Sequence, residues 1–136
     1  MPVALELHRS MVANYNAYVW WYLRRSYGLM TEDGQVSKRG HIMAWFAKYV
    51  RPGYVRIAAT EKPHADVFVS AYRNSNGKLV VVAINSGSAQ RQVQLQLSGA
   101  SAAAFSKYRT TATINNIRGS IRSAGARPAP ISIRPA

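Results

Sequence analysis

The chain has 136 residues and a formal net charge of +13, which comes from 18 Lys and Arg against five Asp and Glu. Apolar residues make up 48% of it, which is normal for a globular protein and excludes wholesale disorder. Cys is absent, which excludes disulfides and thiolate metal sites. All five acids precede Val67, so the second half is basic throughout. This balance favours polyanionic partners, and an inert basic surface fits it at least as well.

The sequence shows neither a membrane span nor an export signal. No apolar run approaches the roughly 20 residues that cross a bilayer, and the short apolar start contains Glu6. His8, His41 and His64 are too scattered for any metal-ligand spacing. We therefore expect no membrane partner, no metal and no cofactor.

Helical and then extended periodicity marks the beginning of the chain. Apolar residues recur at helical spacing over residues 2–13, which predicts a helix that Pro2 can begin. The run "AYVWW", residues 17–21, predicts a short apolar strand whose side chains alternate in direction. Residues 22–36 contain few apolar positions and predict a loop.

A second helix is predicted to begin after Ser37, a favourable N-cap, and to end at "RPG", residues 51–53. Its apolar stripe includes Ile42 and Phe46. An apolar strand needs neighbours on both edges. The first fifty residues are therefore expected to be the end of something larger.

The periodicity changes to two after residue 53. Strands are predicted over residues 54–58, 66–73, 78–85, 91–97 and 104–114. "NSNG", residues 74–77, predicts the turn of a hairpin. The pattern favours antiparallel β structure of the sandwich type. Residues 118–136 mix Arg, Pro, Gly and Ala with little pattern and are expected to form an irregular basic tail.

Trp21, Arg25 and Tyr27 form the candidate binding site. If residues 17–21 are a strand of a parallel barrel, Trp21 stands at the active-site end and the other two lie in the following loop. A guanidinium binds a carboxylate through two charge-assisted hydrogen bonds, and aromatic rings pack on sugars. Together they suit an acidic sugar. The alternative from spacing alone is that the tryptophans are core and the arginines cap the fold at the surface.

The segment "NAYVWWYLRRSYGLMTEDGQVSKRGHIMAWFAKYVRPGYVRI", residues 16–57, resembles the end of the catalytic domain of the family 30 glucuronoxylanases. "VFVSAYRNSNGKLVVVAINSG", residues 67–87, resembles the start of their side β-domain. The resemblance covers roughly residues 5–97 and fades beyond them. It implies an α/β plus all-β fold: the last strand and helix of a (β/α)8 TIM barrel, followed by an incomplete antiparallel β-sandwich side domain.

This resemblance implies a domain organisation and a set of roles. Residues 1–52 would be the end of the catalytic barrel, residues 53–117 the β-sandwich, and residues 118–136 the basic tail. Family members cleave the β-1,4-xylan backbone and recognise its (methyl)glucuronic acid branches. Trp21, Arg25 and Tyr27 match the family residues that contact the glucuronate. No residue here matches the acid/base or nucleophile glutamate, so we expect a C-terminal part that is inactive alone.

The expected partner is glucuronoxylan. The chain is also expected to be able to self-associate or to be complemented by the missing barrel half. The parent enzyme is expected to be secreted or periplasmic, although this chain shows no signal peptide. Two other functions stay open. One is a carbohydrate-binding β module. The other is a basic nucleic-acid-binding protein, which no recognisable binding motif supports, so we expect no nucleic-acid partner.

Overall fold

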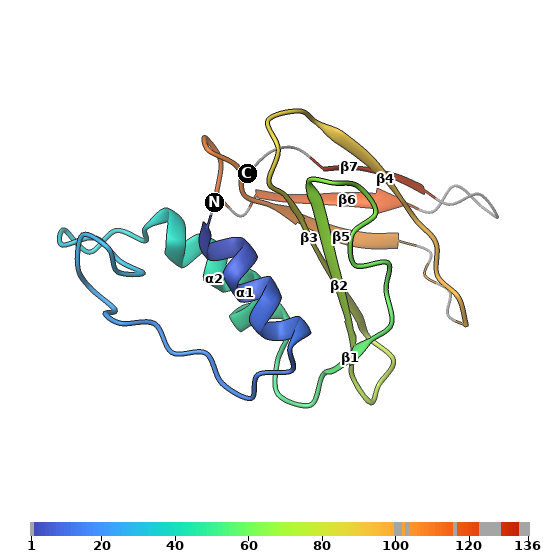
Figure 1. Ribbon diagram of the computed structural model, residues 1–136, viewed down its shortest axis with the longest axis horizontal. Helices are drawn as coiled ribbons and strands as arrows, with labels where there is room; N and C mark the ends of the chain where they lie inside the picture. Colours follow the sequence, from blue (N-terminus) through green and yellow to red (C-terminus); the bar gives the residue numbers. More distant parts are fainter. Residues whose placement is uncertain (1, 100–101, 103, 116, 123–128, 134–136) are drawn as a thin grey trace.

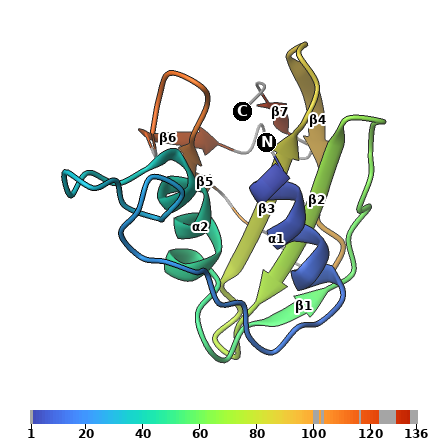
Figure 2. The same cartoon turned by 60° about the vertical axis from the view of Figure 1, so that its left-hand side comes forward.

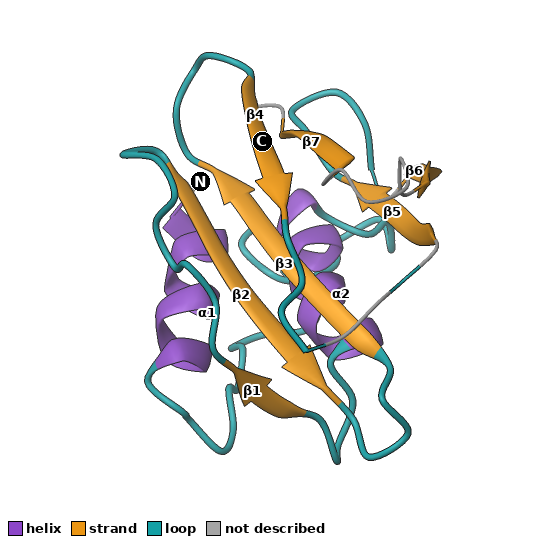
Figure 3. Cartoon of the chain, turned by 90° about the vertical axis from the view of Figure 1, so that its right-hand side faces the viewer, coloured by secondary structure: helices purple, strands orange, loops and turns teal. Residues whose placement is uncertain are grey.

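Two helices cover one face of a three-stranded antiparallel sheet (Figures 1 and 3). The structure, a computed structural model, describes residues 2–99, 102, 104–115, 117–122 and 129–133. In chain order the described elements are α1 (Pro2–Val12), α2 (Lys38–Tyr49), β1 (Val55–Ile57), β2 (Val67–Arg73), β3 (Leu79–Asn85), β4 (Arg91–Leu95), β5 (Ala104–Arg109), β6 (Ile117–Arg122) and β7 (Ala129–Ile133). None of the described helices is both long and apolar enough to cross a bilayer.

Both predicted helices form, and α2 begins and ends where the sequence indicates. The Ser37 side chain accepts a hydrogen bond from the Gly40 backbone N–H at 3.2 Å, as an N-cap does. At the other end the Val50 N–H still donates to the carbonyl of Phe46 at 2.9 Å. Pro52 cannot continue the helix, and Gly53 follows with φ of 89°.

The predicted hairpin joins β2 and β3. Their seven paired positions run from Val67 opposite Asn85 to Arg73 opposite Leu79. The turn between them is closed by the Asn74 side chain, whose Oδ1 accepts from the Lys78 backbone N–H at 2.8 Å. β1 pairs with the outer edge of β2, so the sheet order is β1-β2-β3.

The core lies between the helices and this sheet. It is a single cluster of seven buried side chains: Ala4, Leu7, Ile42, Phe46, Tyr72, Val82 and Ile84. The rings of Phe46 and Tyr72 meet edge to face, with centroids 6.5 Å apart. The buried hydroxyl of Tyr72 donates to Ser70 Oγ at 3.0 Å, so its polar atom keeps a partner. The two parts of the sequence that differ in periodicity thus share one core.

Two further strand pairs, β4–β7 and β5–β6, lie beyond the β3 edge of the sheet (Figure 3). α2 also contacts the segment that follows β5. The Trp45 indole N–H donates to Thr110 Oγ1 at 3.2 Å, and Lys38 Nζ donates to the Thr111 carbonyl at 2.8 Å. α2 is therefore held on two sides, by the sheet and by this segment.

The strand expected over residues 17–21 is not formed. These residues are extended but irregular, and no backbone hydrogen bond joins residues 16–22 to any described part of the chain. The physical reason is that a strand needs a hydrogen-bonded neighbour, which the described residues do not supply here. The apolar pattern of "AYVWW" was visible, but its pairing depends on segments outside it.

The end of the chain also differs from expectation. Within the irregular tail predicted over residues 118–136, the described residues form most of β6 and all of β7. β7 pairs antiparallel with β4, with Ile131 opposite Val93 and Ile133 opposite Arg91. The alternation of Ile and Ser in this short stretch suits a strand that pairs with the edge of β4. The composition of the stretch does not show that β4 is its partner. The remaining residues of the predicted tail lie outside the described chain.

Candidate functional site

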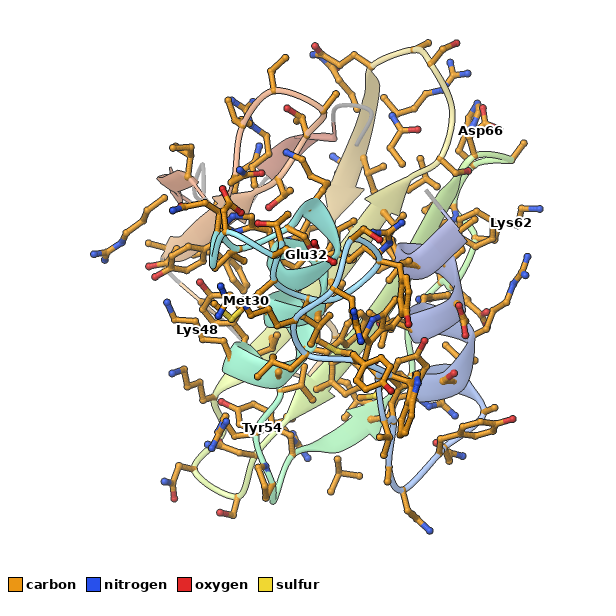
Figure 4. The ribbon with its side chains drawn as sticks, turned by 90° about the vertical axis from the view of Figure 1, so that its left-hand side faces the viewer. Met30, Glu32, Lys48, Tyr54, Lys62 and Asp66 are labelled. Carbon is orange, nitrogen blue, oxygen red and sulfur yellow. The ribbon has the colours of Figure 1, made fainter. Side chains whose placement is uncertain are left out.

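Trp21, Arg25 and Tyr27 lie in the long connection between α1 and α2, on the side of the helices away from the sheet (Figure 1). All three residues are exposed. The exposed fraction is 71% for Trp21 and 45% for Tyr27. Figure 4 shows Met30 and Glu32, from the same connection, in front of α2. The alternative that Trp21 is core is therefore wrong for this chain.

Residues 23–30 form a tight reversal that presents Arg25 and Tyr27. The Met30 backbone N–H donates to the Leu23 carbonyl at 2.8 Å, and the Arg25 N–H donates to the Met30 carbonyl at 3.2 Å. A further bond runs from the Gly28 N–H to the Arg25 carbonyl at 2.8 Å. The loop therefore has internal order of its own, which reduces the entropy lost when it binds a ligand.

Gly28 is required by the close approach of backbone atoms inside this reversal. A Cβ at this position would lie 2.7 Å from the Leu23 carbonyl oxygen and 2.8 Å from the Arg25 nitrogen. Real Cβ atoms do not approach backbone so closely, and the backbone here cannot rotate away as a flexible side chain can. Only glycine fits between the two arms of the loop.

The reversal is fastened to the start of α2. Ser37 Oγ donates to the Gly28 carbonyl at 2.7 Å while it accepts from Gly40, so one hydroxyl both caps the helix and holds the loop. Arg39 donates to the Ser26 carbonyl at 3.3 Å. On the other side, the Trp20 indole N–H donates to the Tyr27 carbonyl at 3.2 Å. These bonds fix the backbone of the residues that carry the candidate site.

The two adjacent arginines have different roles. The Arg24 guanidinium donates through Nε, at 3.0 Å, and through Nη2 to the Glu32 carbonyl, so it closes the outer part of the loop. Arg25 makes no side-chain hydrogen bond or ion pair with any described residue. Its guanidinium lies 5.5 Å from the ring centroid of Tyr22. One arginine is structural, and the other is available to a ligand.

Tyr22 stands at the centre of the site, and sequence reasoning missed it. Its ring centroid is 4.5 Å from that of Trp21 and 6.3 Å from that of Tyr27, with the Arg25 guanidinium above it. The peptide bond between Trp21 and Tyr22 is cis. We call Trp21, Tyr22, Arg25 and Tyr27 the aromatic–arginine cluster. Tyr22 belongs to the loop predicted over residues 22–36, where the sequence has no periodicity that could have revealed this contact.

The charges around the cluster favour an anionic ligand. The two acids of the same loop, Glu32 and Asp33, are exposed. A hydrogen bond from Thr31 lowers the pKa of Asp33, so that carboxylate is ionised and already engaged within its own turn. A planar guanidinium with no carboxylate partner in the described chain can bind one from a ligand in a bidentate manner. Neighbouring rings offer apolar faces to the rest of such a ligand.

The cluster has no metal-binding chemistry. The described residues contain no group of three or more His, Asp or Glu that could hold a metal ion. The arrangement can therefore do three things: stack against a ring, bind a carboxylate and donate tyrosine hydroxyls. These properties suit an anionic ligand with an apolar face.

Residues 53–115 match the family described as the glycosyl hydrolase family 30 beta sandwich domain. This match covers 63 of the 136 residues, and similarity to a solved glycoside hydrolase family 30 structure extends over 98% of the chain. The resemblance noted from the sequence is thus confirmed.

The chain is also similar to individual relatives and solved structures. Over 116 residues the chain is 49% identical to glucuronoxylanase XynC of Bacillus subtilis (strain 168), which covers 85% of this chain and 27% of the relative. The chain therefore spans about a quarter of the length of the curated relatives that it matches. Among solved structures, a GH30 endoxylanase from Clostridium papyrosolvens C71 superimposes with a TM-score of 0.91 at 35% identity, over 98% of this chain and 35% of that one.

A second solved structure agrees with the first. It is a glycoside hydrolase family 30 subfamily 8 xylanase, Xyn30A, from Clostridium acetobutylicum, with a TM-score of 0.88 at 30% identity. Its match likewise covers 98% of this chain and 35% of that chain. The arrangement of the helices, the loop and the strands is thus shared with two xylanase structures.

Replacement of Gly28 by Ala should release the site loop from its anchors. The added methyl group would push apart the Leu23 carbonyl and the Arg25 nitrogen and so weaken the bond between the Trp20 indole and Tyr27. We expect the indole N–H resonance of Trp20 to shift in a proton–nitrogen NMR spectrum while that of Trp45 stays unchanged.

Gly119→Ala is the matched control, because a Cβ at that position meets nothing within 4 Å. It should leave both indole resonances in place. An unshifted Trp20 resonance in the Gly28→Ala chain would contradict the packing described for this loop.

Proposed function

We propose that this chain is part of a family 30 glucuronoxylanase and that Trp21, Arg25 and Tyr27 bind the (methyl)glucuronic acid branch of xylan. The observation that supports it best is the exposed Arg25 guanidinium, which lies 5.5 Å from the centroid of the Tyr22 ring and has no carboxylate partner in the described chain. Two curated relatives at 49% identity are named glucuronoxylanases. Tyr22 would hold the guanidinium from below through a cation–π contact.

In this proposal residues 1–52 are the end of a (β/α)8 barrel, residues 53–117 its β-sandwich side domain, and residues 17–21 the last barrel strand. Among the described residues none pairs its backbone with residues 16–22, which supports this, because an extended apolar segment in that state is suited to pairing with strands outside it. Exposed apolar side chains there, including Val19 at 87%, support complementation by the rest of the barrel or self-association. The whole enzyme would then be secreted or periplasmic, where xylan is met.

The branch would bind in a defined way. The carboxylate would accept two hydrogen bonds from Arg25, and the sugar ring would stack on Trp21, which is the more exposed of the two neighbouring rings. The hydroxyl of Tyr27 would donate to a sugar or carboxylate oxygen. Such a site recognises the branch and takes no direct part in cleaving the backbone.

Substitution of Arg25 by Gln tests the binding role. Hydrogen bonds to charged groups contribute about 1.5–3 kcal/mol, so affinity for a xylo-oligosaccharide with one glucuronic acid branch should fall by about 10- to 100-fold. The measurement is titration calorimetry of the full chain at low salt, since an exposed charge pair is screened as salt rises.

Arg51→Gln removes the same charge from an exposed position at the end of α2, where the guanidinium donates to the Ala47 carbonyl. This control should keep the affinity of the parent chain. Equal losses in the two variants would mean that only net charge matters. Equal binding of branched and unbranched oligosaccharides by the parent chain would overturn the assignment of the branch.

We also expect the chain alone not to hydrolyse glucuronoxylan. Retaining hydrolysis needs two carboxyl groups roughly 5–5.5 Å apart across the scissile bond. The acids nearest the cluster in sequence are Glu32 and Asp33, which are exposed, and Asp33 is engaged by Thr31. A reducing-sugar assay with purified chain should give the same rate as buffer, and release of xylo-oligosaccharides would refute this expectation.

A further inference from the structure

His8 is a buried titratable residue on α1, the helix that lies against the sheet in Figure 2. Its surface is 0% exposed, and its ring meets that of Phe68 on β2 edge to face at 5.8 Å. Neither ring nitrogen makes a hydrogen bond with a described residue. A buried polar group without a partner destabilises the fold, so its presence in this contact calls for a physical account.

The charged groups that face His8 come from two elements. Glu61 and Lys62 belong to the segment before β2, and Figure 4 shows Lys62 at the side of α1. His8 Nε2 lies 3.5 Å from Glu61 Oε1, too long for a good hydrogen bond, and the Glu61 side chain is 54% exposed. The Lys62 ammonium lies over the ring of Phe68, which also contacts the His8 ring. Arg9 follows His8 on the same helix and adds a positive charge near it.

Charging His8 in this position is unfavourable. Burial lowers the pKa of His8, and this outweighs the opposing effect of Glu61, while Arg9 lowers it further. When α1 is undocked, the imidazole regains water and an ordinary pKa near 6.5. The undocked form therefore binds the proton more tightly than the docked form.

We propose that His8 makes the docking of α1 onto β2 sensitive to acid, so that α1 is held on the sheet at neutral pH and loosened as the pH falls below about 6.5. The sign follows from the proton balance. Above the pKa of the free imidazole both forms are neutral and docking is at full strength. Below it only the undocked form is protonated, so each further fall in pH favours release until the docked form is protonated too.

Release of α1 would directly affect the start of the site loop. α1 ends at Val12, and the chain continues without another helix or strand to Trp21. Leu7 and Ala4, which are buried in the shared core, would be exposed at the same time. The inference rests on the contact between α1 and β2 and is independent of which ligand the cluster binds.

The test is amide hydrogen exchange of the full chain at pH 7.5 and pH 5.0, corrected for the intrinsic exchange rates. Protection of residues 5–12 should fall by about threefold or more at the lower pH, as expected when a buried histidine titrates. In His8→Leu, an apolar replacement of similar size, protection of residues 5–12 should be the same at both pH values. His64→Gln, which changes an exposed histidine elsewhere, should retain the acid sensitivity.

Glu61→Gln supplies a second arm if His8→Leu does not fold. It removes the group that favours the charged imidazole, so the loss of protection at pH 5.0 should become larger. The proton NMR titration of His8 should have its midpoint below the ordinary imidazole pKa, which is near 6.5. Protection of residues 5–12 that does not change with pH, a His8→Leu chain that stays acid-sensitive, or an unchanged or smaller loss in Glu61→Gln would overturn the proposal.

Discussion

The packing of Leu7 and Phe46 against Tyr72 and Ile84 is the contact on which the rest of the molecule depends. It joins the helical first part of the sequence to the β-rich second part in one apolar layer. Burial of apolar side chains contributes about 1.5–3 kcal/mol each. Because α1 and α2 flank the site loop, this packing also fixes where that loop begins and ends.

The site loop is then built by backbone hydrogen bonds rather than by a core of its own. Ser37 links the start of α2 to the reversal at Gly28, and Trp20 holds the backbone of Tyr27. The aromatic–arginine cluster can therefore be exposed and still ordered. Because the backbone that carries the Arg25 guanidinium is already ordered, less entropy would be lost when an acidic branch binds, which supports the proposed recognition.

Much of the fold could be predicted because its signals are local. Ser37 and the Pro52–Gly53 pair bound α2, and the Asn-Gly turn sets the register of the β2–β3 hairpin. The strand expected at residues 17–21 failed because pairing is a property of neighbours, and the described chain supplies none. For the same reason β7 was missed, since its partner β4 lies more than thirty residues away in the sequence.

In the site, too, some features could be predicted from the sequence and others required the fold. Residue types and the family resemblance were enough to select Trp21, Arg25 and Tyr27 as candidates. Only the fold shows that the guanidinium of the neighbouring Arg24 is engaged by the Glu32 carbonyl. Tyr22 escaped notice because it falls in the predicted loop of residues 22–36, where no periodicity could indicate its contact with Trp21. His8 gave no sequence signal at all, since a histidine at a helical apolar position is usually ordinary packing.

The claim that helices and sheet form one cooperative core is tested most directly by Ile42→Val, a mild deletion in the part of the core that α2 contributes. Such a change costs about 0.5–1.5 kcal/mol. Native-state hydrogen exchange at pH 7.5 should show the same fall in the free energy of opening for the slowest amides of β3 as for those of α2. A fall confined to α2, with β3 unchanged, would mean that the two parts fold separately and would contradict the account.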